Sequence, residues 1–112
     1  MKRSLSVLLA ASAAAVGLMA VPGTANAAGG CKTMSAPGGG SAYVCKHYYS
    51  QGGGLYYGDF SVSSASSRVY AQAYYDGNVQ TVTSRGGSTS GGFSDVAKFH
   101  VRVCNSGCSA WF

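Results

Sequence analysis

The sequence is very poor in acidic residues. Its 112 residues contain no glutamate, and the only carboxylate side chains belong to Asp59, Asp76 and Asp95. A pair of carboxylates for general acid and base catalysis is therefore difficult to assemble. The two histidines are candidates to assist a serine, but the stretch GSTSG at 87–91 has threonine at its centre and does not match the nucleophile elbow. We therefore expect that the protein is not an enzyme, and we assign no catalytic residue.

Large aliphatic residues are also scarce. Isoleucine is absent, and beyond Ala27 the only leucine is Leu55, whereas valine recurs and all aromatic residues lie beyond position 42. Valine, tyrosine and phenylalanine favour β-strands. Beyond the N-terminal apolar run there is no convincing helical period, and alternation of period two is broken by glycines. The scarcity of large aliphatic residues and the recurrence of valine and aromatic residues therefore predict an all-β chain with a thin core.

The N-terminus has the pattern of a secretory signal peptide. Lys2 and Arg3 precede an apolar run over 5–21, which is followed by a small-residue stretch that ends at Ala27. The run is shorter than the roughly 20 residues that a membrane-spanning helix needs. We therefore predict a signal peptide over 1–27, cleavage after Ala27, and a mature chain, 28–112, that is a single secreted domain without a membrane anchor.

Four cysteines follow the predicted signal, and an even count in a short exported chain indicates disulfides. Three connectivities are open. Loop closure favours near neighbours, so we predict Cys31–Cys45 and Cys104–Cys108. The first would close a loop of about 15 residues and contribute about 3 kcal/mol. Zinc binding by His100, Cys104 and Cys108 is the weaker alternative, because no fourth ligand is evident and export favours the disulfide. We expect no metal and no cofactor.

The predicted strands are short and separated by glycine-rich turns. They cover residues 42–50, 55–63, 67–75, 79–84 and 96–104, with shorter pieces near Lys32 and Trp111. Five to seven short strands of this kind indicate a small disulfide-stapled antiparallel β-sandwich or a small barrel.

The stretch CKHYYSQGGGLYYGDF, 45–60, predicts a hairpin with a four-residue loop over 51–54. In that register Lys46 lies opposite Asp59, and Tyr48 lies opposite Tyr57. Alternation then separates two faces. The predicted core face carries Tyr43, Cys45, Tyr49, Tyr56, Phe60 and Val62. The predicted solvent face carries Lys46, Tyr48, Tyr57 and Asp59.

A second hairpin is predicted at Asp76-Gly77, which is a strong type I′ turn signal. Its inward residues are Val69, Ala71, Ala73 and Val82. Its outward residues are Arg68, Tyr70, Gln72, Tyr74, Thr81 and Thr83. In the last predicted strand, Ala97, Phe99, Val101 and Val103 form the apolar side, and Lys98, His100 and Arg102 form the opposite side. The outer surfaces are therefore expected to be basic and rich in tyrosine.

Exposed tyrosines suggest binding, because their rings stack on sugars or bases at little entropic cost. The mature chain has six basic and three acidic side chains, a formal charge of +3 that favours anionic partners. Tyrosine also suits the solvent face of a sheet without any ligand. The candidate stacking residues are Tyr48, Tyr57, Tyr70 and Tyr74. The candidate residues for steering anionic groups are Lys46, Arg68, Lys98 and Arg102.

These features predict a binding module for a cell-surface polysaccharide or a secreted protein. A specific nucleic-acid partner is not expected, since dense Lys/Arg stripes and known motifs are absent. One alternative is a secreted inhibitor of a hydrolase, with an exposed loop over Arg85 to Gly92 inserted into the enzyme. Another is a small antimicrobial toxin, which the charge and disulfides favour although no amphipathic element is evident.

Two resemblances accompany this interpretation. The ending FHVRVCNSGCSAWF, 99–112, after a body rich in glycine and tyrosine, resembles small secreted proteins of mycelial Gram-positive bacteria. That resemblance implies export and a β-sheet domain but no activity. In size and in two local disulfides the chain is similar to secreted proteinaceous α-amylase inhibitors, which are β-sandwiches. Their Trp-Arg-Tyr triplet is missing, because Trp111 lies between Ala110 and Phe112, so no inhibitory residue is carried over.

Overall fold

The described part of the chain is built from strands alone. A computed structural model describes residues 28–112, and the predicted signal peptide lies outside the described residues. The strands are β2 (Ala28–Ser35), β3 (Ser41–Gly52), β4 (Leu55–Ser63), β5 (Tyr70–Tyr75), β6 (Asn78–Thr81), β7 (Thr89–Val96) and β8 (Phe99–Cys104). Within 28–112, no helix is found that is long and apolar enough to cross a membrane.

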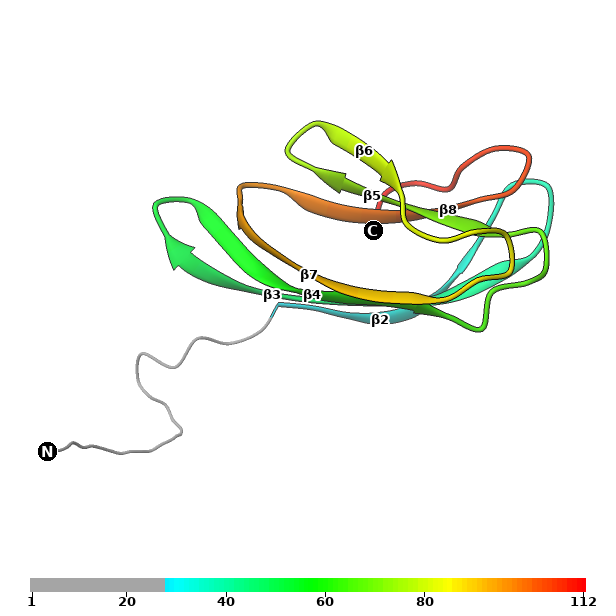
Figure 1. Cartoon of the computed structure of the whole chain (residues 1–112), viewed down its shortest axis with the longest axis horizontal. Helices are drawn as coiled ribbons and strands as arrows, with labels where there is room; N and C mark the ends of the chain where they lie inside the picture. Colours follow the sequence, from blue (N-terminus) through cyan, green and yellow to red (C-terminus); the bar gives the residue numbers. More distant parts are fainter. Residues whose placement is uncertain (1–27) are drawn as a thin grey trace, which may run out of the picture.

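The strands form two antiparallel sheets, one in the order β2-β3-β4-β7 and the other in the order β6-β5-β8. The two sheets lie as layers over each other (Figure 1). The turn between β7 and β8 carries the chain from one layer to the other (Figure 1). The prediction of a small, disulfide-stapled, all-β fold is confirmed, in the sandwich form.

The core between the layers is made mainly of valine and phenylalanine. The most deeply buried valines are Val44, Val62, Val69, Val101 and Val103. Phe60 and Phe99 are buried with them, and their ring centroids are 5.3 Å apart. The tyrosines contribute less than predicted, since Tyr43 is 43% exposed and Tyr49, also predicted inside, stacks on Tyr57 on the outer side. Valine is therefore the main core residue, as expected for strands that pair closely.

Both predicted disulfides are present. Cys31 and Cys45 are direct partners across β2 and β3, and Cys104 is bonded to Cys108 beyond the end of β8. Two disulfides within so short a chain are typical of extracellular proteins. The sulfur atoms of Cys104 and Cys108 are bonded to each other, so the alternative zinc site with His100 is not formed.

The register of the first hairpin differs from the prediction by one residue. The turn is not a four-residue loop: Gly52 pairs with Leu55, and Gly53 and Gly54 form a two-residue turn with φ of 67° and 77°. These left-handed conformations are the ones that a type I′ turn requires and that glycine adopts easily. Gln51 is left as a bulge between the paired residues. The tight turn and the bulge together account for the shift.

This shift reverses the two faces of β3. Ala42, Val44 and Lys46 are buried between the sheets, whereas the predicted core residue Tyr43 is exposed. Cys45 and Tyr49, also predicted inside, share the outer side with Tyr43. Only the β4 residues of the predicted core face, Tyr56, Phe60 and Val62, keep the predicted side. Asp59 consequently pairs with His47 and not with Lys46.

The second hairpin has the predicted turn and nearly the predicted faces. Asp76 and Gly77 have φ of 48° and 97°, and Tyr75 pairs with Asn78. The alanines of β5 are buried as expected. Thr83 was predicted outward but is buried, because its hydroxyl accepts a 2.8 Å hydrogen bond from the Ala71 amide. Ala97 was predicted on the apolar side of a strand, but it is exposed in the turn before β8.

Strand β7 was missed, because its sequence TSGGFSDV is rich in serine and glycine. Half of the segment from Arg85 to Gly92, predicted as a free loop, belongs to this strand and pairs with β4. The predicted strand over 96–104 begins later, at Phe99, since Val96 ends β7. A glycine-rich edge strand has little hydrophobic alternation, so its pattern is similar to that of a loop.

Candidate binding sites

The residues predicted to form one binding face are distributed over the molecule. They are Lys46, Tyr48 and Lys98 at a cavity between the sheets, Tyr70, Tyr74 and Arg102 on the outer side of the β6-β5-β8 sheet, Tyr57 on the outer side of the other sheet, and Arg68 in the connection between β4 and β5. Two of these groups are clusters, and each includes residues that the sequence reasoning did not select.

The first cluster is the aromatic–arginine face, which we define as Tyr70, Tyr74, Arg85, Arg102 and Trp111. The Arg102 guanidinium lies 4.2 Å from the centroid of the Trp111 ring, and the Tyr74 and Trp111 centroids are 5.6 Å apart. The Arg85 guanidinium lies 4.8 Å from the centroid of the Tyr70 ring. Each arginine therefore lies over an aromatic ring, an arrangement stabilised by about 0.5–1 kcal/mol at exposed sites.

Hydrogen bonds orient the arginines of this face. Gln72 lies directly opposite Arg102 in the pairing of β5 with β8, and its Oε1 accepts bonds of 3.0 and 2.8 Å from Nε and Nη2 of Arg102. The amide of Gln72 donates to the Thr81 hydroxyl of β6 at 3.3 Å. The Arg85 guanidinium donates to the backbone carbonyl of Arg68. The outer face is thus an ordered polar network with aromatic rings beside it.

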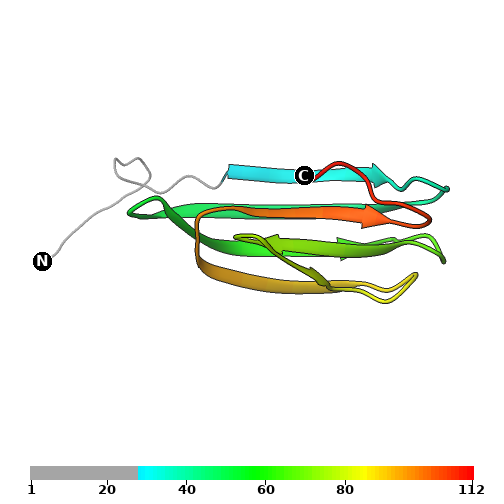
Figure 2. The same cartoon turned by 90° about the horizontal axis from the view of Figure 1, so that it is seen from above.

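The end of the chain supplies Trp111. The Val101 and Phe112 backbones exchange hydrogen bonds of 3.1 and 2.7 Å, which extends the sheet beyond β8. The segment is also tied by the Cys104–Cys108 disulfide. Figure 2 shows this end of the chain lying over β2. A short strand near Trp111 was predicted from the sequence. Alternation along it directs Trp111 outward and Phe112 inward, but Trp111 was not predicted to be a binding residue.

The second cluster is the lysine cleft, a cavity of about 200 Å³ between the two sheets. It is lined by Lys46 and Tyr48 of β3, Tyr56 of β4, Phe93 of β7, Phe99 and His100 of β8, and Ala97 and Lys98 of the turn between β7 and β8. Lys46 is only 6% exposed, contrary to its predicted place on a solvent face.

The ammonium of Lys46 contacts aromatic rings and no carboxylate. Its Nζ is 4.7 Å from the centroid of Phe112 and 5.7 Å from that of Tyr48. Lys32 approaches the same Phe112 ring at 4.5 Å. Within residues 28–112 the one ion pair joins His47 to Asp59, and the Lys46 side chain donates no hydrogen bond. A cation–π contact of about 2 kcal/mol does not offset the several kcal/mol that burying a charge costs.

The electrostatics of the cleft reflect this lack of an anion. Desolvation by burial lowers the pKa of Lys46, and the charge of Lys32 lowers it further. Desolvation also lowers the pKa of His100, with added repulsion from Lys46 and Lys98, while a hydrogen bond with the Phe112 backbone acts in the opposite direction. Lys46 and Lys98 thus place positive charge at one aromatic-walled space, where the lowered pKa of His100 favours its neutral form.

The turn that closes the cleft is held by side chains from both hairpins. The Asp76 carboxylate accepts hydrogen bonds from the Ala97 amide at 3.0 Å and the Lys98 amide at 2.7 Å. Gln51, the bulged residue of β3, donates from its side-chain amide to Asp95 Oδ1 at 2.6 Å and accepts from the Asp95 backbone amide at 3.0 Å. Two of the three carboxylates are therefore engaged in fixing this turn.

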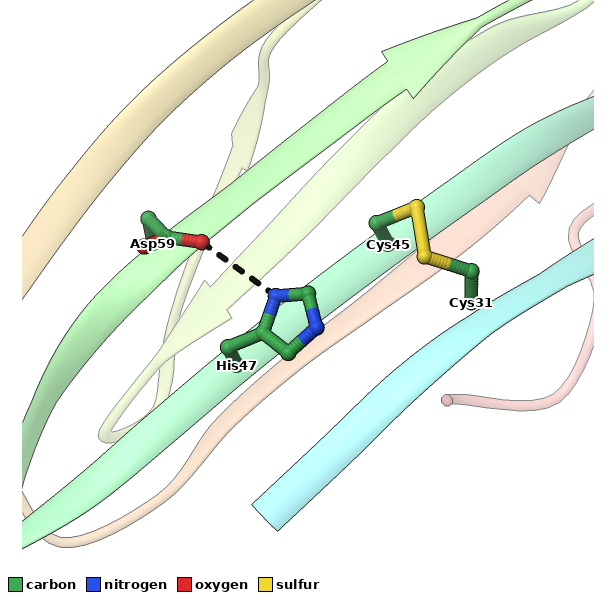
Figure 3. Close-up of polar contacts among 4 residues, drawn as sticks. All are labelled: Cys31, Cys45, His47 and Asp59. Atoms are coloured by element: carbon green, nitrogen blue, oxygen red, sulfur yellow. Dashed lines mark ion pairs between the residues drawn. A yellow bond between two sulfur atoms is a disulfide. The ribbon is translucent and has the colours of Figure 1, made fainter. Parts of the chain in front are cut away.

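The third carboxylate lies on the far side of the larger sheet, away from the cleft. His47 Nδ1 is 3.5 Å from Asp59 Oδ1, beside the Cys31–Cys45 disulfide (Figure 3). Both side chains of this pair are well exposed, so the pair contributes little to stability. The Tyr57 ring stacks on Tyr49 of the neighbouring strand with centroids 5.2 Å apart. Tyr57 is thus on a different face from the other candidate tyrosines.

In the part of the chain that the structure describes, no group of three or more histidine, cysteine or acidic residues is arranged to hold a metal ion. The chemistry of the described residues is instead that of aromatic rings beside cationic and amide groups. Comparison of the chain with protein-family models, curated proteins and solved structures found no significant match.

Proposed function

We propose that residues 28–112 are a secreted, non-enzymatic module that binds a cell-surface polysaccharide through the aromatic–arginine face. The observation that carries this proposal is the cluster around Trp111, whose ring centroid lies 4.2 Å from the Arg102 guanidinium and 5.6 Å from the Tyr74 centroid. Aromatic rings present apolar faces to sugar rings, and guanidinium and amide groups hydrogen-bond to hydroxyls or carboxylates.

The extent of the face favours a polymer over a single sugar. Tyr70 and Tyr74 lie on one strand with four residue steps between them, which at about 3.3 Å per residue separates them by roughly 13 Å. Arg85 and Arg102 add positive charge along this line. The face therefore offers contacts to several consecutive sugar units, with a preference for polymers that carry anionic groups.

The proposed location rests on the two disulfides and the N-terminal sequence. Disulfides persist in oxidising compartments, and the pattern over residues 1–27 is that of a secretory signal. A secreted module without assigned catalytic residues would act by retaining itself, or a partner, at a surface.

The test is depletion of the oxidised chain 28–112 from solution by insoluble cell wall, chitin and cellulose at low and high salt. We expect depletion by at least one polymer, and a loss of affinity of about fivefold or more in Trp111→Ala, by analogy with the stacking of a base on one aromatic ring, which is worth about 1–3 kcal/mol. Tyr57→Ala is the matched control, since it removes an exposed ring from the opposite sheet.

The two variants discriminate between the faces. Loss of binding in Trp111→Ala with retention in Tyr57→Ala supports the aromatic–arginine face. Equal binding by both variants, or no depletion by any polymer, contradicts the proposal. Partial sensitivity to salt is expected, since exposed arginines act in solvent where salt screens their charge.

A further inference from the structure

The lysine cleft is a second site, distinct from the aromatic–arginine face and independent of the proposed polymer binding. Its central feature is Lys46, a side chain more than nine-tenths buried that lines a cavity and has no anionic partner among residues 28–112. Buried charges in folded proteins are normally paired or hydrogen-bonded. A buried, unpaired lysine in the wall of a cavity indicates that the partner comes from outside the chain.

No acidic side chain among residues 28–112 is free to serve as that partner. Asp59 is paired with His47 on the outer side of the larger sheet. Asp76 accepts hydrogen bonds from the amides of the turn between β7 and β8, and Asp95 is held by Gln51. These are all the acidic side chains in the sequence. The partner of Lys46 is therefore sought in a ligand, since within residues 28–112 no ion pair joins Lys46 to an acidic side chain or to the chain terminus.

The walls of the cleft specify an aromatic body for that ligand. Phe93 stacks on Phe99 with centroids 4.0 Å apart, and Tyr48 lies edge-to-face with Tyr56 at 5.4 Å. A protein cavity of about 150 Å³ lined by apolar side chains holds one benzene molecule. The cleft, at about 200 Å³, has space for one ring and a small polar substituent.

We propose that the lysine cleft binds a small carboxylate that carries a single aromatic ring, with the carboxylate at the Lys46 ammonium and the ring among Tyr48, Phe93 and Phe99. Lys98 lines the same space and adds positive potential at its wall. The aromatic walls exclude a purely inorganic anion as the best ligand, because its hydration would be replaced by ring faces on several sides.

The probes are benzoate, benzyl alcohol and acetate, which separate the contributions of ring and charge. Binding to the oxidised chain 28–112 is followed by two-dimensional NMR. We expect saturable binding of benzoate, at least tenfold tighter than that of benzyl alcohol or acetate, with shifts concentrated at Tyr48, Phe93 and Phe99. Benzoate shifts that do not saturate, or that are spread over all the surface basic residues, would overturn the proposal.

The variant Lys46→Met removes the charge and keeps an apolar chain of similar length. We expect its benzoate affinity to fall to the level of benzyl alcohol. Lys32→Met is the matched control, since Lys32 contacts the same Phe112 ring but does not line the cleft, and it should keep benzoate binding within about twofold. Unchanged benzoate affinity in Lys46→Met would contradict the proposal.

A measurement on the wild-type chain keeps the test independent of how the variant folds. The NMR signals of the Lys46 side-chain terminus should move with benzoate and remain still with benzyl alcohol. If benzoate binds without moving them, the ligand occupies another place and the proposal is wrong.

Discussion

Trp111 and Phe112 are adjacent in the chain, yet they contact basic side chains on opposite sides of one sheet. On the outer side, Arg102 lies over Trp111 and donates two hydrogen bonds to Gln72. On the inner side, Lys46 lies near Phe112, is buried, and donates no hydrogen bond within the described residues. Both cations lie near an aromatic ring. The arginine also has a hydrogen-bond partner in the chain, whereas the lysine has neither a hydrogen-bond partner nor an anion among the described residues.

Arg102 is therefore expected to stabilise the folded state, whereas Lys46 is expected to destabilise it. A half-exposed arginine with amide partners retains favourable interactions in the free protein. A buried lysine without a partner raises the free energy of the folded state, and a bound anion would recover part of that cost. We therefore expect the two basic residues to respond oppositely to removal.

The largest expected effect on binding at both sites comes from removing the Cys104–Cys108 disulfide. In the chain-entropy model, Cys104→Ser/Cys108→Ser loses about 2 kcal/mol of unfolding free energy, since the closed loop is short. Because this bridge ties the segment that carries Trp111 and Phe112, we expect both polymer depletion and benzoate binding to weaken. Urea denaturation and the two binding assays measure the effects.

The control is Cys31→Ser/Cys45→Ser, which opens a longer loop on the outer side of the larger sheet, facing away from the cleft. It should cost more stability, about 3 kcal/mol, while the remaining folded protein binds both ligands normally. Normal binding of both ligands by the Cys104→Ser/Cys108→Ser chain would show that the bridge does not organise the two sites.

Smaller changes in the free energy of unfolding are expected at the two basic residues, with opposite signs for Lys46 and Arg102. Lys46→Met should raise the free energy of unfolding by about 1–2 kcal/mol, because it removes an unpaired buried charge. Arg102→Met should lower it by about 1 kcal/mol, because the hydrogen bonds to Gln72 are lost. Denaturant midpoints at neutral pH measure both changes. Destabilisation by Lys46→Met would mean that its ring contacts outweigh desolvation.

The smallest expected effect is a pH dependence specific to Lys46. Its pKa in the folded state is lowered below the ordinary 10.5, so between the two values the unfolded chain binds more protons. Stability conferred by this group therefore increases as pH rises from the lowered pKa towards 10.5. Tyr75 acts oppositely near pH 10, because burial raises its pKa, but it does so in the wild type and in Lys46→Met alike.

The informative quantity is therefore the stability difference between Lys46→Met and the wild type as a function of pH. We expect that difference to shrink as the pH rises into this window. A difference that is constant up to pH 10.5 would show that Lys46 titrates normally in the folded chain.

Much of the fold follows from local chemistry in the sequence. The pairing of near-neighbour cysteines, the Asp76-Gly77 turn and the alternation of β5 were all predicted and confirmed. The turn and the alternation depend on a few adjacent residues with strong backbone preferences, and the cysteine pairing depends on the closure of short loops. The predicted register of the first hairpin was wrong for two reasons. Three successive glycines permit several turn lengths, and the bulge at Gln51 is stabilised by Asp95, which lies 44 residues away in the sequence.

The candidate sites were predicted less well for the same reason. Ala42 and Val44 are apolar alternate residues and would have placed Lys46 inward, but an expected ion pair with Asp59 outweighed that signal. Trp111 was assigned no role, because its position depends on pairing of the chain end with β8. The cleft requires side chains from both sheets, and no local pattern encodes how the two layers meet.

The most direct test of the difference between the two sites is an NMR titration of the lysine side chains in the oxidised chain 28–112, with and without benzoate. Lys46 should titrate below its ordinary pKa in the free protein, and benzoate should raise that pKa. A Lys46 that titrates near 10.5 in the free protein and does not respond to benzoate would contradict an unpaired charge that awaits an anionic ligand.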